Sequence, residues 1–170
     1  MYSAEAVANF FIGKGLEEGR PITPMQLQKL IYFAHGWHLA VYGSPLINEK
    51  VEAWPYGPVV PSIYHAVKRN GAARIESLIT TLNRQGTAIE TPMVSGPRTL
   101  ALLERIWDVY GHYSAVQLSR MSHDPKGPWH KTWNDEAKRG EIRGVDIPDA
   151  EMKRYFIESA RQNRTTTTAA

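Results

Sequence analysis

The segment TPMQLQKLIYFAHGWHLAVYGSPLINEKVEAWPYGPVVPSIYHAVKRNG, residues 23–71, decides the fold predicted for this chain. It contains the signals of a capped helix, a short extended stretch, a turn with two prolines and a second helix. It holds no group of side chains typical of an enzyme active site. Its aromatic residues around prolines and a glycine indicate a rigid scaffold. This pattern favours a protein that binds a partner over one that catalyses a reaction.

The first helix of this segment, residues 23–42, has the clearest boundaries. Thr23 is a favourable N-cap, and Pro24 stands at the first helical position, where its missing N–H costs no hydrogen bond. Apolar residues recur until about residue 42, and Gly43 and Pro45 then end the pattern. We expect this long apolar helix to be the central helix of the core.

The sequence WPYGP, residues 54–58, predicts a rigid corner after a short strand within residues 46–54. Each proline favours extended geometry in the residue before it, and Gly57 permits a backbone conformation that other residues avoid. A helix over residues 61–70 is expected to follow, with Gly71 as its stop signal.

The whole pattern predicts a mainly α protein: a single compact helical domain of about seven helices with a short strand or hairpin. The domain is expected to span residues 1–160, and residues 161–170, RQNRTTTTAA, are expected to form a disordered C-terminal tail. The other expected helices cover residues 3–18, 74–83, 97–112 and 114–121, a short stretch around Trp129 and Trp133, and a final stretch from Pro148. Extended stretches are expected at residues 87–94 and 142–147.

Length and composition are those of an ordinary soluble domain. The 170 residues suffice for one core, with 42% hydrophobic and 22% charged residues. The absence of cysteine excludes disulfides and thiolate catalysis. The N-terminal residues lack the pattern of a signal peptide, and no apolar run is long enough to cross a membrane. We therefore expect a cytoplasmic protein with no membrane partner.

The charge pattern gives little support to a nucleic-acid partner. The net charge is +3, and the basic residues are scattered without a dense stripe. This favours a solvated basic surface. A nucleic-acid-binding regulator remains an alternative, and residues 114–133 are the nearest approach to a helix-turn-helix.

Several histidines raise the alternative of a metal-dependent hydrolase. His35 and His38 share a helix face, while His123, Asp124 and His130 lie close together in a later loop. The chain has no HExxH motif and no compact ligand set with standard spacing. Structural hydrogen bonding is the favoured interpretation, and we expect no metal, no cofactor and no catalytic residues.

Two aromatic residues on the corner are candidate contacts for a protein partner. Trp54 and Tyr56 lie on a proline-rich element where rings can protrude, and a rigid exposed ring loses little entropy on binding. For Trp54, core filling is a slightly better explanation than contact with a partner. For Tyr56, core filling and contact with a partner are equally good explanations.

Three groups of motif residues resemble the Panacea domain of SocA-like antitoxins, a family also found in phage-associated proteins. The resemblance extends over about residues 3–157. The residues that carry it are Thr23, Pro24, Leu27, Lys29, Leu30 and Tyr32, then Ala53, Trp54, Gly57, Pro58 and Val59, and finally Leu118, Ser119, His123, Pro128 and Trp129.

The resemblance implies a mainly helical antitoxin without catalytic residues. Such proteins neutralise a cognate toxin protein by direct binding, and some deliver it to the ClpXP protease. The motif residues look like the scaffold of the domain, and the identity of the toxin does not carry over. The tail of residues 161–170 has an alternative role as a handle for such a protease.

Overall fold

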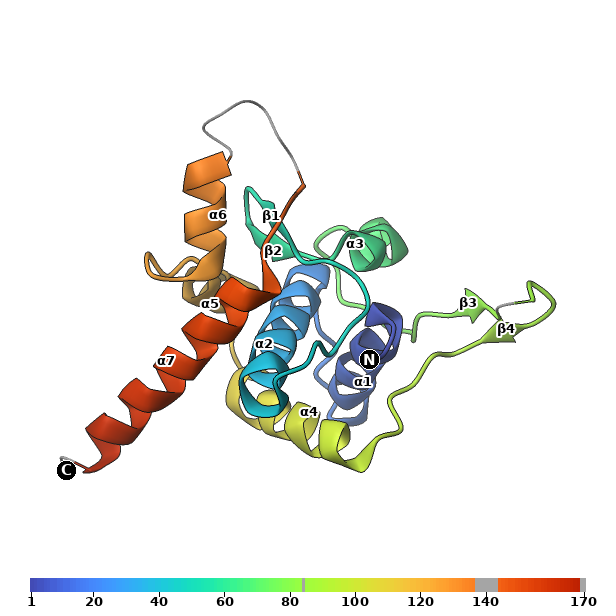
Figure 1. Ribbon diagram of the computed structural model, residues 1–170. Coiled ribbons are helices and arrows are strands. Elements are labelled where there is room, and N and C mark those ends of the chain that lie inside the picture. Colours follow the sequence, from blue (N-terminus) through green and yellow to red (C-terminus); the bar gives the residue numbers. More distant parts are fainter. Residues whose placement is uncertain (84, 137–143, 169–170) are drawn as a thin grey trace.

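Helix α2 is the element around which the rest of the chain is arranged. The computed structural model describes residues 1–83, 85–136 and 144–168 (Figure 1). The helices in these ranges are α1 (Ala4–Glu17), α2 (Pro24–Tyr42), α3 (Pro61–Val67), the 3-10 helix η1 (Lys68–Asn70), α4 (Pro97–Tyr110), α5 (Ala115–Ser122), α6 (Pro128–Glu136) and α7 (Asp149–Thr168). The strands are β1 (Glu52–Trp54), β2 (Gly57–Val59), β3 (Thr81–Leu82), β4 (Ile89–Glu90) and β5 (Val145–Asp146).

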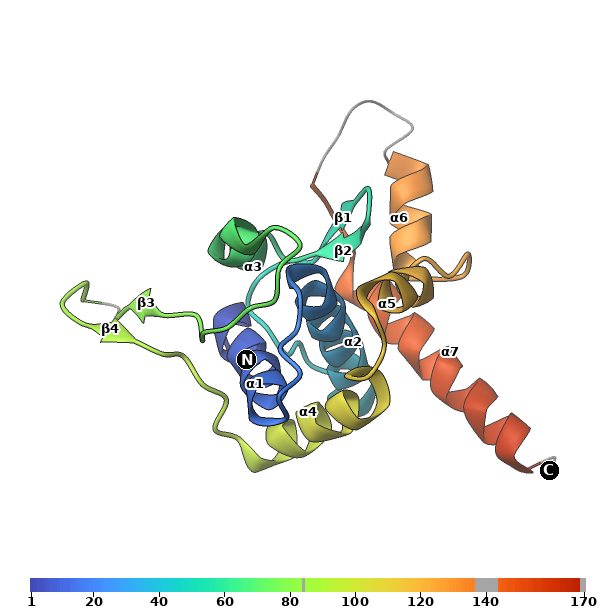
Figure 2. The same cartoon turned by 180° about the vertical axis from the view of Figure 1, so that it is seen from behind.

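The predicted central helix is confirmed. At the start of α2, Thr23 and Gln26 form a capping box, in which each side chain accepts a hydrogen bond from the other's backbone N–H. Gly43 ends the helix with a φ of 74°. Helices α1, α4, α5 and α7 all pack against α2, which explains why it is apolar around most of its surface (Figures 1 and 2).

Packing explains why a glycine, Gly36, stands in the middle of α2. A Cβ added at this position would lie 2.0 Å from a ring carbon of Phe156 on α7. The glycine therefore lets the aromatic ring of α7 approach the backbone of α2, which offsets its low helix propensity. Tyr32, Phe33 and Trp37 of α2 also contact the Phe156 ring.

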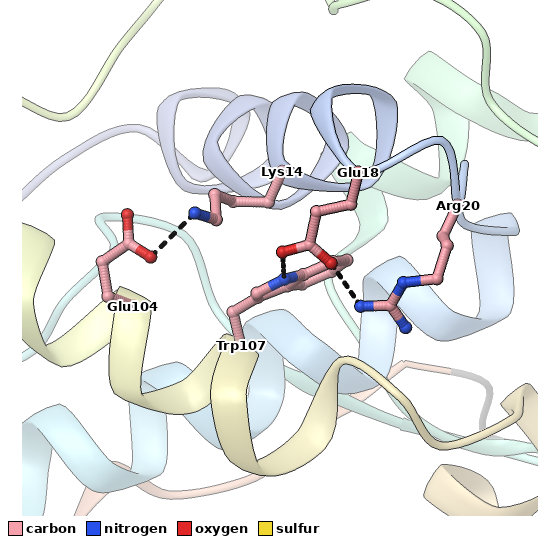
Figure 3. A network of polar contacts seen from close by, with 5 residues as sticks. All are labelled: Lys14, Glu18, Arg20, Glu104 and Trp107. Carbon is pink, nitrogen blue, oxygen red and sulfur yellow. Dashed lines mark hydrogen bonds and ion pairs between the residues drawn. The ribbon is translucent and has the colours of Figure 1, made fainter.

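A network of polar contacts joins α1 to α4 (Figure 3). The Lys14 ammonium lies 3.0 Å from the Glu104 carboxylate, and the Trp107 indole N–H donates to Glu18 over 2.7 Å. The Arg20 guanidinium also binds Glu18 and stacks over the Trp107 ring. The hydrogen bond from Arg20, followed by that from Trp107, holds the pKa of the Glu18 carboxyl below its usual value.

A small antiparallel sheet lies at the N-terminal end of α2 (Figure 1). Its strand order is β2-β1-β5. Trp54 of β1 is paired with Gly57 of β2, so that Pro55 and Tyr56 form the connection between the strands. This hairpin confirms the predicted corner, and β5 adds Asp146 opposite Glu52.

The helix predicted for residues 74–83 is wrong. This segment is extended and leads into β3. The buried side chain of Asn9 on α1 donates to the carbonyls of Ile79 and Pro92, both over 2.9 Å, and accepts from the Ile79 N–H over 2.7 Å. The two bonds to Ile79 satisfy backbone groups that a helix would have paired internally. The described residues of the segment between Ile79 and Pro92, 79–83 and 85–92, project as a hairpin that we call the arm (Figures 1 and 2).

Other boundaries differ from the prediction by smaller amounts. The strand expected at residues 87–94 is reduced to Ile89–Glu90. Residues 142 and 143 of the expected stretch 142–147 lie outside the described residues, and the rest contains β5. Helix α7 continues through Thr168, where a disordered tail was expected from residue 161. Adding residues to an existing helix costs far less than nucleating one, which favours such an extension. Residues 169–170 lie outside the described residues.

None of the helices in the described ranges combines the length and apolar character needed to cross a membrane.

Candidate partner-binding site

Two neighbouring side chains of α2 hold the corner in place. The Gln28 amide donates to the Val60 carbonyl over 3.1 Å and accepts from the Val60 N–H over 2.8 Å, so it acts as a substitute strand partner. The Lys29 ammonium donates to the Pro58 carbonyl over 3.0 Å. All three bonds are buried, and they fix β2 against the first turns of α2.

Gly57 is required at the corner for two reasons. Its φ is +104°, a conformation that side-chain-bearing residues rarely adopt. A Cβ at this position would also lie 2.7 Å from the Lys29 Nζ and 3.0 Å from the Ser122 Oγ. The predicted unusual backbone conformation is therefore confirmed, and the space beside it is occupied by Lys29.

Lys29 is a buried amine beneath the corner. The residue is only 1% exposed, and no ion pair to its ammonium occurs in the part of the chain that the structure describes. Burial lowers the pKa of this amine from 10.5 to about 7, because the charged form loses its hydration. Its hydrogen bond to Pro58 is compatible with either protonation state.

The third group of motif residues supports the corner from the other side. The Trp129 indole N–H donates to the Trp54 carbonyl over 3.0 Å, and the Ser119 hydroxyl donates to the Tyr56 carbonyl over 3.3 Å. The His123 ring packs edge-on against Trp129 with 3.9 Å between ring centroids, while its Nδ1–H donates to the Ser119 carbonyl. Residues far apart in the sequence therefore converge on one turn, as a scaffold requires.

The two candidate contact residues occupy different positions on this corner. Tyr56 is 74% exposed and projects from the turn. Trp54 is half-buried, with its ring 5.0 Å from that of Tyr64 and its indole N–H bonded to Glu52. Trp54 therefore combines scaffold packing with partial exposure, whereas core filling does not explain the exposed Tyr56.

Beside these rings the surface is hollowed into a groove of about 280 Å³. Its floor includes Gln28 and Lys29, and Lys68 stands on its rim. No acidic residue lines it among the residues that the structure describes. The apolar residues of the lining include Met25, Trp54, Pro55, Tyr56, Val59 and Tyr64. We call this feature the corner groove. A mostly apolar groove with a few polar groups is the usual form of a binding site.

The histidines considered for a metal site make separate hydrogen bonds. His35 binds the Asp149 carboxylate over 3.2 Å, and His38 binds the Ser44 carbonyl over 2.7 Å. Asp124 accepts from the Tyr155 hydroxyl. Within the described ranges, no three histidine or acidic side chains come together as a possible metal site.

The remaining residues of that hypothesis lie at the C-cap of α5 and within α6. His123 contacts Trp129, and His130 is bonded to Asn134 one turn further along α6. The same two helices span residues 114–133, the segment considered for nucleic-acid binding. They pack against α2 and β1, respectively, so part of each helix surface is occupied within the chain.

Several residues of the site were missed by sequence reasoning. Gln28 carried a usable signal, because a polar residue next to Lys29 inside an apolar helix needs a buried partner. Met25, Tyr64 and Lys68 carried none, because they belong to separate elements that only the folded chain brings to one groove.

Comparison with known proteins places this corner in a family. The family described as "Antitoxin SocA-like, Panacea domain" matches residues 27–130. The chain is also 39% identical over 136 residues to the protein named Antitoxin SocA of Caulobacter vibrioides (strain NA1000 / CB15N), covering 74% of this chain and 68% of that protein. No solved structure matches the chain. The family match includes the corner, Lys29 and Trp129, while Thr23 and Pro24 precede it. The chain therefore belongs to the family of SocA-like antitoxins that carry the Panacea domain.

Proposed function

We propose that this protein is an antitoxin that neutralises a cognate toxin protein by direct binding through the corner groove. The observation that carries the proposal is the exposed Tyr56 ring beside an apolar groove, on a corner that buried hydrogen bonds hold in place. The action is proposed to take place in the cytoplasm, where a toxin made by the same cell is met.

The geometry suits a binding role because the surface is formed before the partner arrives. Gln28, Lys29 and Trp129 each hold a backbone carbonyl of the corner or its flank, so little conformational freedom is left to lose. A preorganised surface binds more tightly than a flexible one of equal area. A stable complex needs about 1,200–2,000 Å² of buried surface in total, so the groove would form the centre of a larger interface.

The test is co-expression with the open reading frame beside this gene. That product alone is expected to arrest growth, and the wild-type protein is expected to relieve the arrest. Tyr56→Ala should relieve it poorly. Val41→Ala is the matched control, because Val41 is also an apolar residue that is more than half exposed, but it lies near the end of α2 and outside the groove. Arrest that the wild-type protein fails to relieve would contradict the proposal.

Delivery of the bound toxin to a protease such as ClpXP is a separate part of the proposal. It rests on the family and on no contact within this chain. The toxin's half-life in cells with and without the protease tests it. If this protein does not change the half-life of the toxin, delivery to a protease is excluded and neutralisation occurs by binding alone.

The other two functions considered from the sequence have no such support. No observation among the described residues favours a metal-dependent hydrolase or a nucleic-acid-binding regulator, and we propose neither.

A further inference from the structure

We infer that the corner groove receives one large apolar side chain of the partner together with an acidic residue next to it. The inference rests on the proposed function, since it names the chemistry of the partner segment at the same site. It commits to a protein segment as the occupant.

The size of the groove sets the size of the apolar group. Its volume of about 280 Å³ is slightly below the range of about 300–1,000 Å³ typical of sites for drug-sized ligands. Such a space suits one large side chain. Trp54 and Tyr64 offer ring faces and edges to an apolar group, and Met25 offers a flexible thioether that adapts to its shape.

The charges around the groove set the second requirement. Lys68 is exposed on the rim, and no ion pair to it occurs within the described ranges. Lys29 lies in the floor, and the nearby carboxylate of Glu52 is bonded to Trp54 and is not part of the lining. The exposed ammonium of Lys68 therefore favours a carboxylate from the partner.

A carboxylate that enters the groove is attracted more strongly than one on an open surface. Part of the groove is enclosed by aromatic rings, which lower the local dielectric constant and strengthen charge interactions. The desolvated amine of Lys29 also prefers its charged form more strongly once a carboxylate is near. The ammonium of Lys68 is the group that a partner can reach directly, so it carries the test.

The experiment uses two short probes and the full chain. N-acetyl-Trp-Asp-amide and N-acetyl-Trp-Lys-amide are titrated into ¹⁵N-labelled protein at low salt, and binding is followed by two-dimensional NMR. The acidic probe is expected to shift the Trp54 indole signal and the amides near Val59 and Val67. It should bind about two- to fivefold more tightly than the basic probe, the size of one partly exposed charge pair.

Charge reversal on the rim provides the matched comparison. Lys68→Glu is expected to abolish or invert the preference for the acidic probe. Arg69→Glu is the control, because this neighbouring exposed residue carries the same charge but does not line the groove. Only Lys68→Glu should change the ratio of the two dissociation constants.

Three results would overturn the inference. They are equal affinity for the two probes, signal changes confined to residues outside the groove, and no binding at 20 mM of either probe. Each is distinguishable from failure of the proposed function, because relief of growth arrest is measured without the probes. If the protein relieves growth arrest but binds the two probes equally, it is an antitoxin that recognises its toxin by other chemistry.

Discussion

A glycine and a buried lysine share the same space at the corner, and this pair shows how single residues decide the site. The Lys29 amine reaches the Pro58 carbonyl because Gly57 has no side chain in its path. The positive φ of Gly57 turns the strand at the point where this approach occurs. Backbone conformation and side-chain packing therefore demand the same residue at position 57.

Gly57→Ala is expected to destabilise the protein more than a glycine replacement elsewhere. Strain from the positive φ costs about 1–3 kcal/mol, and the Lys29 side chain must also move. Gly19→Ala is the control, because its φ is also positive at 64° but nothing lies within 4 Å of an added Cβ. Urea unfolding measures both variants. Equal losses in the free energy of unfolding would show that the corner tolerates a side chain.

Lys29 should make the free energy of unfolding depend on pH. Its pKa is about 7 in the folded state and 10.5 when unfolded, so the unfolded chain binds the extra proton between these values. The contribution of Lys29 to the free energy of unfolding therefore rises as the pH increases above 7. Between pH 7.5 and 9 the rise amounts to about 1–2 kcal/mol, since one pH unit corresponds to at most about 1.4 kcal/mol.

Lys29→Met tests that prediction, because it removes the titrating amine and keeps a side chain of similar length. The wild-type protein should gain stability relative to the variant across pH 7.5–9, as measured by chemical unfolding at several pH values. If the two proteins follow parallel curves across this window, the amine is charged in the folded state and the account of its burial is wrong.

At the level of elements, the arm depends on Asn9. Leu82 and Ile89 face each other across the two strands and are 65% and 74% exposed, so the arm has little packing of its own. Isolated two-stranded hairpins are marginally stable in water. The three hydrogen bonds from Asn9 on α1 therefore determine where the arm leaves the body.

Asn9→Ala is expected to cost about 2–3 kcal/mol of stability, because three hydrogen bonds are lost and their partners are partly buried. Hydrogen exchange should become faster at Ile79. Asn83→Ala is the control, because the side chain of Asn83 bonds residues near the tip of the arm, such as Thr87. Unchanged exchange at Ile79 in Asn9→Ala would show that other contacts hold the arm.

The elements that sequence reasoning predicted correctly are those with local signals. Thr23 and Pro24 set the start of α2, and Gly57 marks the corner, because caps and backbone preferences act within a few residues. The segment 74–83 was predicted as a helix because its apolar spacing allows one. Its extended form depends on Asn9, about 70 residues away, and no local pattern reports such a bond.

The candidate site was predictable in part for the same reason. Tyr56 could be chosen from the sequence, since a ring between two prolines lies on a turn. The groove beside it could not, because Met25, Tyr64 and Lys68 come from three elements. Their meeting depends on how α2 and α3 pack against the corner hairpin.

At the scale of the whole molecule, helices packed around α2 present the corner as a fixed surface. The motif residues that carry the resemblance lie mainly beneath this surface, while Tyr56, Lys68 and the wall of the groove face outward. A common scaffold with an adaptable exposed face is an arrangement that allows related proteins to bind different partners.

The affinity of the purified protein for its proposed toxin, the product of the neighbouring open reading frame, tests the central claim most directly. By isothermal titration calorimetry, Tyr56→Ala should weaken binding by about 5- to 30-fold, the effect of losing a central aromatic contact worth about 1–2 kcal/mol. Val41→Ala should bind as the wild type does. If Tyr56→Ala and Lys68→Glu both bind the toxin with wild-type affinity, the claim that the corner groove is the toxin-binding surface is contradicted.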